Sequence, residues 1–265
     1  MLEQERDACI QAAKAGGEVL KGLWRRLDPS TITEKTKNDY VTEADRTSEA
    51  AIHRELDRLL PGLAFLGEET GAQGPQGGRC WVVDPLDGTL NFIQGFPHWC
   101  VSVALWDETG PLAGCVYDPL RDDTYAAARG LGATFNGRPM AVSAQPGLDG
   151  AFLATGFAFQ LGERFETFTR ALRPAFYRAK AIRRGGSAAL DLAQTAAGIY
   201  DGFFEMGLKK WDFGAGVLLV QEAGGVITDW TGGEGWRESG DTVAGNPQVQ
   251  RDLVALTRVV LDPAP

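Results

Sequence analysis

The spacing of apolar residues predicts an alternation of helices and strands along the chain. Apolar positions recur at helical spacing in residues 43–60, with Ile52, Leu56 and Leu59 on one face, and a Pro-Gly pair ends this segment. Short apolar runs bounded by glycine, proline or acidic residues indicate strands. The expected helices are 2–27, 43–60, 163–178, 188–197, 211–223 and 247–260. The expected strands are 63–66, 81–83, 100–106, 111–117, 124–128, 133–135, 203–206, 226–229 and 242–244.

Two segments between these elements are predicted to be loops. Residues 28–40 are polar, and residues 71–78 contain four glycines and a proline. Ser187, directly before the expected helix 188–197, is a typical N-cap residue. No repeat or linker divides the 265 residues, so we expect a single domain, 1–265, with two halves of about 1–150 and 151–265.

Composition and charge argue against several classes of protein. The formal net charge of −9 and the lack of a basic stripe argue against nucleic acid as a partner. No apolar run is long enough to span a membrane, and the charged N-terminus does not resemble a signal peptide. The four cysteines are widely spaced, as expected of reduced thiols in a cytoplasmic protein. With only two histidines, a zinc site or a histidine general base is not expected.

Residues 81–92 carry the most specific chemical signal. The apolar run at their start predicts a buried strand that stops at Asp84 and the proline after it, because proline fixes φ and has no N–H to donate. Asp87 follows three residues later, and two carboxylates held together at a strand end repel each other unless a cation lies between them. Such oxygen ligands suit Mg²⁺. Gly88 then permits a sharp turn and a close backbone approach to a ligand.

Two further acidic residues lie at comparable positions. Glu68 follows the expected strand 63–66, and Asp212 lies in the first turn of the expected helix 211–223. Each of these acids, and an isolated D-x-x-D, is by itself more often an ordinary solvated residue in a turn or at a helix start. Alternating strands and helices, however, bring strand ends together at one edge of a sheet. With Asp84 and Asp87, they give four candidate metal carboxylates.

At this point the chain resembles a known family, the inositol monophosphatases, within a superfamily of Mg²⁺-dependent, Li⁺-sensitive phosphatases. The strings that carry the resemblance are 67–70 (GEET), 84–92 (DPLDGTLNF), 211–216 (WDFGAG) and 222–225 (EAGG). Bacterial members are similar also in 154–157 (ATGF), 186–191 (GSAALD) and 244–247 (AGNP). The resemblance implies an α/β layered sandwich, the five-layer α-β-α-β-α sugar-phosphatase fold, and a homodimer.

The resemblance also implies two to three Mg²⁺ per subunit. Glu68, Asp84 and the Leu86 carbonyl would hold the first ion. Asp84, Asp87 and Asp212 would hold the second, so that Asp84 bridges the two. A weaker third ion would lie near Glu68.

By the same resemblance, the catalytic residues are Glu68, Thr89 and Asp45. Thr89 and Glu68 would orient and deprotonate the attacking water, and Asp45 would hold the Thr89 hydroxyl. The backbone N–H groups of Gly88 and Thr89, at a helix start, would bind phosphate oxygens.

Three further residues match positions that bind the rest of the substrate. Ser187 and Ala188 would line a sugar or cyclitol pocket. Glu205, seven residues before Asp212, would accept a hydrogen bond from a substrate hydroxyl. Strand alternation points Glu205 to the face opposite Phe204.

The expected function is therefore Mg²⁺-dependent hydrolysis of inositol 1-phosphate to inositol and phosphate by metal-activated water. Two ions can stabilise both the attacking and the leaving oxygen of an in-line displacement, so no covalent nucleophile is needed. One alternative is a fructose-1,6-bisphosphatase or another sugar or nucleotide phosphatase of the same superfamily. A second alternative is a non-catalytic role in which this fold binds a partner such as transcription machinery.

Overall fold

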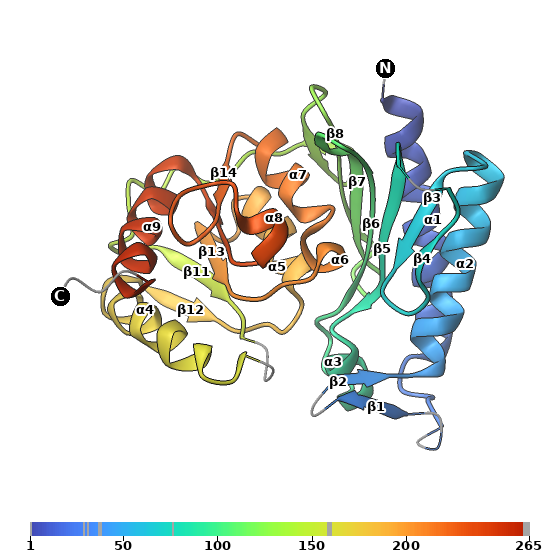
Figure 1. The fold of residues 1–265 in the computed structure, drawn as a ribbon, viewed down its shortest axis with the longest axis horizontal. Helices are drawn as coiled ribbons and strands as arrows, with labels where there is room; N and C mark the ends of the chain where they lie inside the picture. The colour runs from blue at the N-terminus through green and yellow to red at the C-terminus, as the bar shows by residue number, and fades with distance from the viewer. Residues whose placement is uncertain are drawn as a thin grey trace.

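Two β-sheets separated by a layer of helices form the framework of the protein (Figure 1). The computed structural model describes residues 2–28, 30, 32–36, 39–75, 77–157 and 161–261, with only the backbone at 35, 36 and 39. The strands of the larger sheet are β3 (Ala64–Gly67), β4 (Gly71–Gln73), β5 (Cys80–Asp87), β6 (Cys100–Asp107), β7 (Gly110–Asp118), β8 (Asp123–Ala128), β9 (Ala133–Phe135) and β10 (Arg138–Pro139). Their order is β10-β9-β8-β7-β6-β5-β3-β4. β3 and β5 run parallel to each other, and the remaining neighbours are antiparallel.

The smaller sheet is built from the C-terminal half of the chain. Its strands are β11 (Phe152–Thr155), β12 (Ala181–Arg183), β13 (Gly202–Glu205), β14 (Val226–Thr228) and β15 (Thr242–Gly245), in the order β12-β11-β13-β15-β14. Here β11 is parallel to both β12 and β13, whereas β15 is antiparallel to both of its neighbours.

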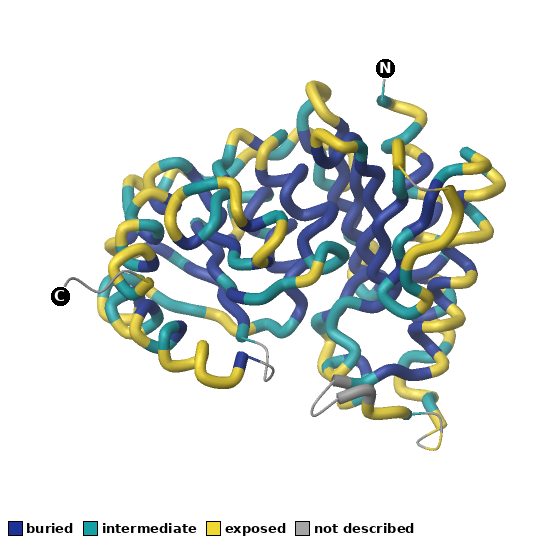
Figure 2. The backbone as a smooth tube through the Cα atoms, viewed as in Figure 1, coloured by how far each residue is buried: buried dark blue, intermediate teal, exposed yellow. Residues whose placement is uncertain are grey.

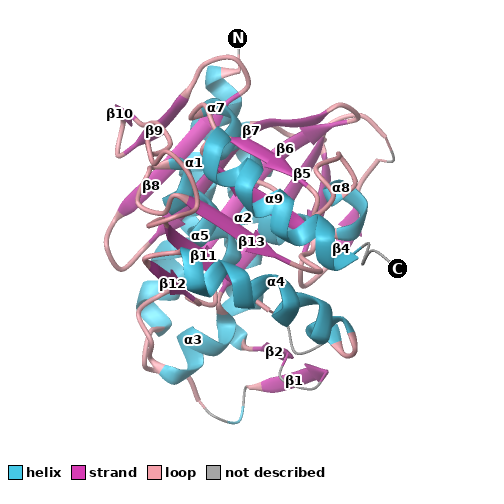
Figure 3. Ribbon diagram, turned by 90° about the vertical axis from the view of Figure 1, so that its left-hand side faces the viewer, coloured by secondary structure: helices cyan, strands magenta, loops and turns pink. Residues whose placement is uncertain are grey.

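Helices lie on both faces of each sheet. They are α1 (Glu3–Leu23), α2 (Glu43–Leu59), α3 (Thr89–Gln94), α4 (Arg164–Arg178), α5 (Ala188–Ala196), α6 (Lys210–Phe213), α7 (Gly216–Glu222), α8 (Trp236–Ser239) and α9 (Pro247–Leu261). The pair α1 and α2 covers one face of the larger sheet, and α5, α6 and α7 lie between the sheets. Figure 3 shows α4 and α9 across the outer face of the smaller sheet. This order of layers confirms the expected α-β-α-β-α sandwich.

Buried residues concentrate where these layers meet (Figure 2), and their apolar side chains form three clusters. One cluster joins α1 and α2 to the larger sheet, a second surrounds α5 and α7 between the sheets, and a third lies under α4 and α9. Small residues let the helices approach closely: a Cβ added to Gly17 of α1 would collide with the Tyr117 ring. Within the described ranges, no helix combines the length and the apolar content needed to cross a membrane.

The prediction of two loops was wrong in part. Residues 33–36 and 39–41 form an antiparallel pair, β1 (Thr33–Thr36) and β2 (Asp39–Val41), and residues 71–73 form the edge strand β4. Residues 29, 31, 37 and 38 of the first segment lie outside the described residues, as does residue 76 of the second. These strands are only three or four residues long, too short for an alternating apolar pattern to mark them in the sequence.

Two expected element boundaries were also wrong. β5 does not stop at Asp84 but continues to Asp87, because a bulge opposite β6 accommodates a proline that has no N–H to donate. The expected helix 211–223 is interrupted between α6 and α7. Trp106 of β6 donates its indole N–H to the Gly214 carbonyl at 3.0 Å, and the Leu218 N–H bonds to the Ala215 carbonyl instead.

We predict that Gly114→Val destabilises the fold, because Gly114 of β7 is where the larger sheet meets the start of α7. A Cβ at this position would lie 3.1 Å from both Cα and Cβ of Ala215. Overpacking of this kind costs about 1–3 kcal/mol, measurable as a lower urea midpoint. Gly22→Ala, in an open position on α1, is the control and should leave stability equal or slightly higher. Equal midpoints for the two variants would contradict this account of the packing.

Candidate active site

The end of β5 carries two acidic residues on either side of its bulge. Asp84 pairs with Ser102 of β6 and Asp87 pairs with Cys100, so three steps along β5 face two steps along β6. Asp84 is 2% exposed, and its Oδ1 accepts the Leu86 N–H at 3.0 Å. The bulge therefore keeps both carboxylates at one end of the strand.

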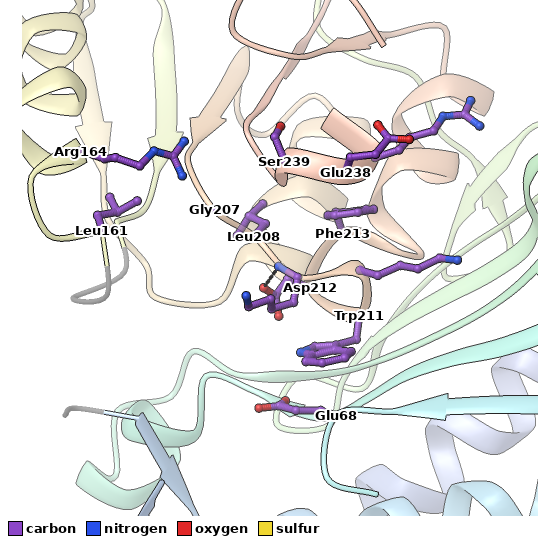
Figure 4. A pocket seen from close by; sticks show the side chains of 13 residues that line it. Glu68, Leu161, Arg164, Gly207, Leu208, Trp211, Asp212, Phe213, Glu238 and Ser239 are labelled. Atoms are coloured by element: carbon purple, nitrogen blue, oxygen red, sulfur yellow. Dashed lines mark hydrogen bonds between the residues drawn. The ribbon is translucent and has the colours of Figure 1, made fainter. Parts of the chain in front are cut away.

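Glu68 lies beside this strand end because β3 runs parallel to β5. Gly67 is in register with Val83, and the Glu68 N–H donates to the Val83 carbonyl at 3.1 Å. A pocket of about 740 Å³ is lined by both Glu68 and Asp212 (Figure 4). Two of the four candidate metal carboxylates thus face one cavity, although they come from different halves of the chain.

Asp212 reaches the end of β5 from the layer between the sheets. It lies in the first turn of α6, a helix that contacts β5, and its Oδ2 accepts the Lys209 N–H at 2.6 Å. A carboxylate at a helix N-terminus is stabilised by the N–H groups that point toward it. Because the helix is interrupted after Phe213, Asp212 lies at the start of a separate short helix and not within α7.

The mutual repulsion of these carboxylates is centred on Asp84. Burial raises the pKa of Asp84 well above its ordinary value, and the charges of Glu68, Asp87 and Asp212 raise it further. The pKa of Asp87 rises to about 6, chiefly through burial, although its hydrogen bonds oppose the shift. The strand end therefore holds more negative charge than its surroundings neutralise.

These residues fit a hydrated divalent cation. All four side chains supply hard oxygen donors, and their excess negative charge would be offset by the ion. Within the described part of the chain, no three or more His, Cys, Asp or Glu side chains form a ready-made metal-ligand group. Mg²⁺ keeps several waters in its shell, so carboxylates that do not already form a closed group can hold it partly through those waters. The donor set therefore suits Mg²⁺ better than a metal ion whose ligands must all come from the protein.

The structure brings Asp45 and Thr89 together at the start of α3. Thr89 Oγ1 lies 3.0 Å from Asp45 Oδ1 and 3.1 Å from the Leu86 carbonyl oxygen. The other carboxylate oxygen of Asp45 accepts the Thr42 N–H at 2.8 Å and the Thr42 hydroxyl at 2.7 Å. Burial raises the pKa of Asp45, and the bonds from Thr42 and Thr89 oppose this. Asp45 thus has a fixed orientation from which one oxygen reaches Thr89.

Asp87 connects β5 to the N-terminus of α5. Its Oδ2 accepts the Ser187 hydroxyl at 2.8 Å and the Ala189 N–H at 2.7 Å. Ser187 occupies the N-cap position, as predicted, but its side chain makes no capping hydrogen bond, and Asp87 of the larger sheet accepts the first-turn N–H instead. Ser187 and Ala188 are only 1% and 8% exposed, so each offers a substrate little surface.

Asn91 and Gly88 hold the two halves together next to Asp87. Asn91 donates its amide to the His98 carbonyl at 2.7 Å and to the Gly185 carbonyl at 2.9 Å. Gly88 has a φ of +100°, and a Cβ there would lie 3.0 Å from the His98 carbonyl and 3.2 Å from the Gly186 carbonyl. The turn into α3 therefore requires glycine both for its conformation and for this close approach.

Glu205 lies at the end of β13, near the same group of acids. Phe204 packs into the outer core, and Glu205 points toward Gly156, where any Cβ would collide with its carboxylate. Burial raises the pKa of Glu205 well above its ordinary value, and the charges of Asp191, Asp212 and Asp87 raise it further. Glu205 therefore lies within electrostatic reach of Asp87 and Asp212, two of the four candidate metal carboxylates.

Sequence reasoning assigned no role to Glu49, Asn91 or Asp191. Glu49 of α2 is buried and accepts two backbone N–H groups from the turn after β3. Asp191 of α5 is 1% exposed, with its Oδ1 3.4 Å from His98 Nε2. Helical spacing was the available signal, since Glu49 follows Asp45 by four residues and Asp191 follows Ser187 by four.

Comparison with known proteins adds a family and several relatives. The sequence model of the inositol monophosphatase family matches residues 1–260. A relative from Pseudomonas aeruginosa, Nus factor SuhB, is 42% identical over 260 residues and is aligned over 96% of each chain.

Solved structures of two similar proteins have the same fold. The extragenic suppressor protein suhB from Bartonella henselae superposes with a TM-score of 0.89 at 39% identity, covering 95% of this chain and 97% of the other. An inositol monophosphatase from Anabaena (Nostoc) sp. PCC 7120 gives 0.85 at 36% identity, covering 96% and 95%.

We predict that Asp87→Asn and Asp212→Asn each weaken Mg²⁺ binding by roughly tenfold or more, measured by titration calorimetry. Each change removes a charged oxygen donor, but an asparagine oxygen can still accept the backbone N–H that each aspartate now accepts, so the thermal midpoint should stay near that of the wild type. Asp57→Asn, an exposed change on α2, is the control for loss of charge. Wild-type isotherms for both site variants would contradict the metal assignment.

Proposed function

The chain belongs to the inositol monophosphatase family, and on this premise we propose that it is a Mg²⁺-dependent phosphomonoesterase that hydrolyses inositol 1-phosphate to inositol and phosphate. The observation that supports this most strongly is the buried Asp84 with three further carboxylates around it. Such repulsion is relieved either by a proton, which the raised pKa of Asp84 favours, or by a bound cation, which the oxygen donors of the site suit.

Two groups of residues would hold the ions. Glu68, Asp84 and the Leu86 carbonyl would bind one Mg²⁺, and Asp84, Asp87 and Asp212 a second, with a weaker third near Glu68. Bound there, Mg²⁺ would lower the pKa of water and offset the charge that develops on phosphate oxygens.

The residues around Thr89 would prepare the attacking water. Asp45 accepts from the Thr89 hydroxyl and so turns the hydroxyl oxygen toward the site, where it can accept a proton of the water. Glu68 would take up the proton as general base. The backbone N–H groups of Gly88 and Thr89, at the start of α3, would hold two phosphate oxygens in place.

The leaving group would lie toward α5 and β13. Glu205 would accept a hydrogen bond from a cyclitol or sugar hydroxyl, and the backbone around Ser187 and Ala188 would form the adjoining wall. Neutralising Asp87 and Asp212 with cations would lower the pKa of Glu205 again and favour its ionised, accepting form.

A partner-binding role is the second candidate, because relatives at about 41–42% identity carry the name Nus factor SuhB. Fructose-1,6-bisphosphate and nucleotide phosphates remain alternative substrates for the same chemistry. We further propose a homodimer of single-domain subunits in the cytoplasm, with Mg²⁺-dependent activity that Li⁺ inhibits.

A substrate panel tests the proposal. With Mg²⁺, kcat/KM for inositol 1-phosphate should exceed that for fructose-1,6-bisphosphate, 2′-AMP and glycerol 2-phosphate. Chelation of the metal should abolish turnover. Absence of phosphate release from every substrate would favour the partner-binding role, and a preference for fructose-1,6-bisphosphate would replace the assigned substrate.

We predict that Glu205→Gln lowers kcat/KM for inositol 1-phosphate more than for glycerol 2-phosphate. A hydrogen bond to a charged acceptor is worth about 1.5–3 kcal/mol, or roughly ten- to a hundredfold, and the smaller substrate lacks most of the hydroxyls. Glu18→Gln, an exposed change on α1, should leave both values unchanged. Equal losses on the two substrates would show that Glu205 does not bind the hydroxyls.

A further inference from the structure

We propose that Glu49 is a positioning residue for Glu68: from α2 it fixes the main chain that carries Glu68 and thereby sets the affinity of the site for Mg²⁺. The inference rests on the proposed function, because it assumes that Glu68 is a metal ligand. It names a residue on a different element from any of the expected ligands.

Glu49 binds the turn between β3 and β4 with both carboxylate oxygens. Oε2 accepts the Glu69 N–H at 3.0 Å, and Oε1 accepts the Thr70 N–H at 3.0 Å. A Cβ on Gly67 would collide with this carboxylate, so glycine at the end of β3 leaves the space that Glu49 fills. Two bonds to successive N–H groups fix the main chain of the turn.

These bonds anchor Glu68 on its C-terminal side. On its N-terminal side, the Glu68 N–H is already bonded to the Val83 carbonyl, one residue before Asp84. The backbone of Glu68 is therefore fixed to β5 on one side and to α2 on the other. Its carboxylate starts from a main-chain position that has little freedom relative to Asp84.

Burial makes this anchor strong. Glu49 is 2% exposed, and a buried carboxylate is costly unless hydrogen bonds offset the loss of water. Hydrogen bonds to a charged acceptor are also stronger than those between neutral groups. If the turn moved away, the Glu49 charge would remain buried without those donors, so the native position of the turn is strongly favoured.

One face of α2 fixes three segments of the site in the same way. Asp45, Ser48 and Glu49 share this face at helical spacing. Asp45 holds the Thr89 hydroxyl, the Ser48 hydroxyl donates to the Pro85 carbonyl at 2.9 Å, and Glu49 holds the turn after Glu68. Because all three come from one rigid helix, the distances between the segments are fixed as well.

The test compares wild type with Glu49→Gln, which keeps the shape but replaces one acceptor oxygen by an NH₂ group facing an N–H. Calorimetric titration with Mg²⁺ alone should show about tenfold weaker binding, and the Mg²⁺ concentration for half-maximal activity should rise by a similar factor. KM for inositol 1-phosphate at saturating Mg²⁺ should change by no more than about twofold. Amide exchange at Glu69 and Thr70 should become faster, while exchange within β5 stays unchanged.

Glu55→Gln, at the surface of the same helix, is the charge-matched control and should behave as wild type. Glu49→Asp keeps the charge but not the reach, and should weaken Mg²⁺ binding in the same direction if the glutamine variant does not fold. A Mg²⁺ isotherm unchanged in the folded variants, or equal changes in Mg²⁺ affinity and substrate KM, would overturn the positioning role alone. Failure of the wild-type protein itself to bind Mg²⁺ would overturn both this inference and the proposed function.

Discussion

Repulsion between the carboxylates near the buried end of β5 is the constraint to which the rest of the site responds. Burial of Asp84 next to Glu68, Asp87 and Asp212 raises its pKa, which means that ionising it costs more in the folded protein than in water. Asp87 shows the same effect, with a pKa of about 6. An acid whose pKa is raised on folding makes the folded state less stable as pH rises from the unfolded-state value through the folded-state value. For Asp87 that window ends near pH 6, and above it a bound cation would restore stability.

Backbone N–H groups hold these acids in place despite the repulsion. Asp84 accepts from Leu86, Asp87 from Ala189 and Asp212 from Lys209, and Glu49 holds the turn that carries Glu68. Two of these donors belong to helix N-termini, whose partial positive charge favours an anion. Main-chain donors cannot rotate away as side chains do, so they fix the direction of each carboxylate as well as its charge.

The parts of this fold that local patterns determine could be read from the sequence. The helix expected at 43–60 lies at Glu43–Leu59, because its apolar face and its Thr42–Asp45 capping box both act within a few residues. The interruption at Gly214 could not be predicted, since its cause is the indole of Trp106, more than a hundred positions earlier. The N-cap position of Ser187 was predicted, but the role of Asp87 could not be, because this acceptor of the first-turn N–H of α5 comes from the larger sheet. The resemblance proposed the acidic residues as neighbours, and in the structure the charges of Glu68, Asp87 and Asp212 do act on Asp84. The only signal for Glu49 was its helical spacing from Asp45, which by itself does not distinguish it from other residues on that face.

Asp87 links the two halves of the chain. One of its oxygens closes the N-terminus of α5 and holds Ser187, which fixes the wall of the pocket where a leaving group would lie. The same carboxylate belongs to the acidic group at the end of β5, and its charge adds to burial and to the charges of Asp191 and Asp212 in raising the pKa of Glu205. A cation near Asp87 would therefore act on both sides at once: it would relieve repulsion within β5 and make Glu205 a better acceptor. Under the proposed function, binding of the ion and recognition of the substrate hydroxyls would thus be linked through one side chain.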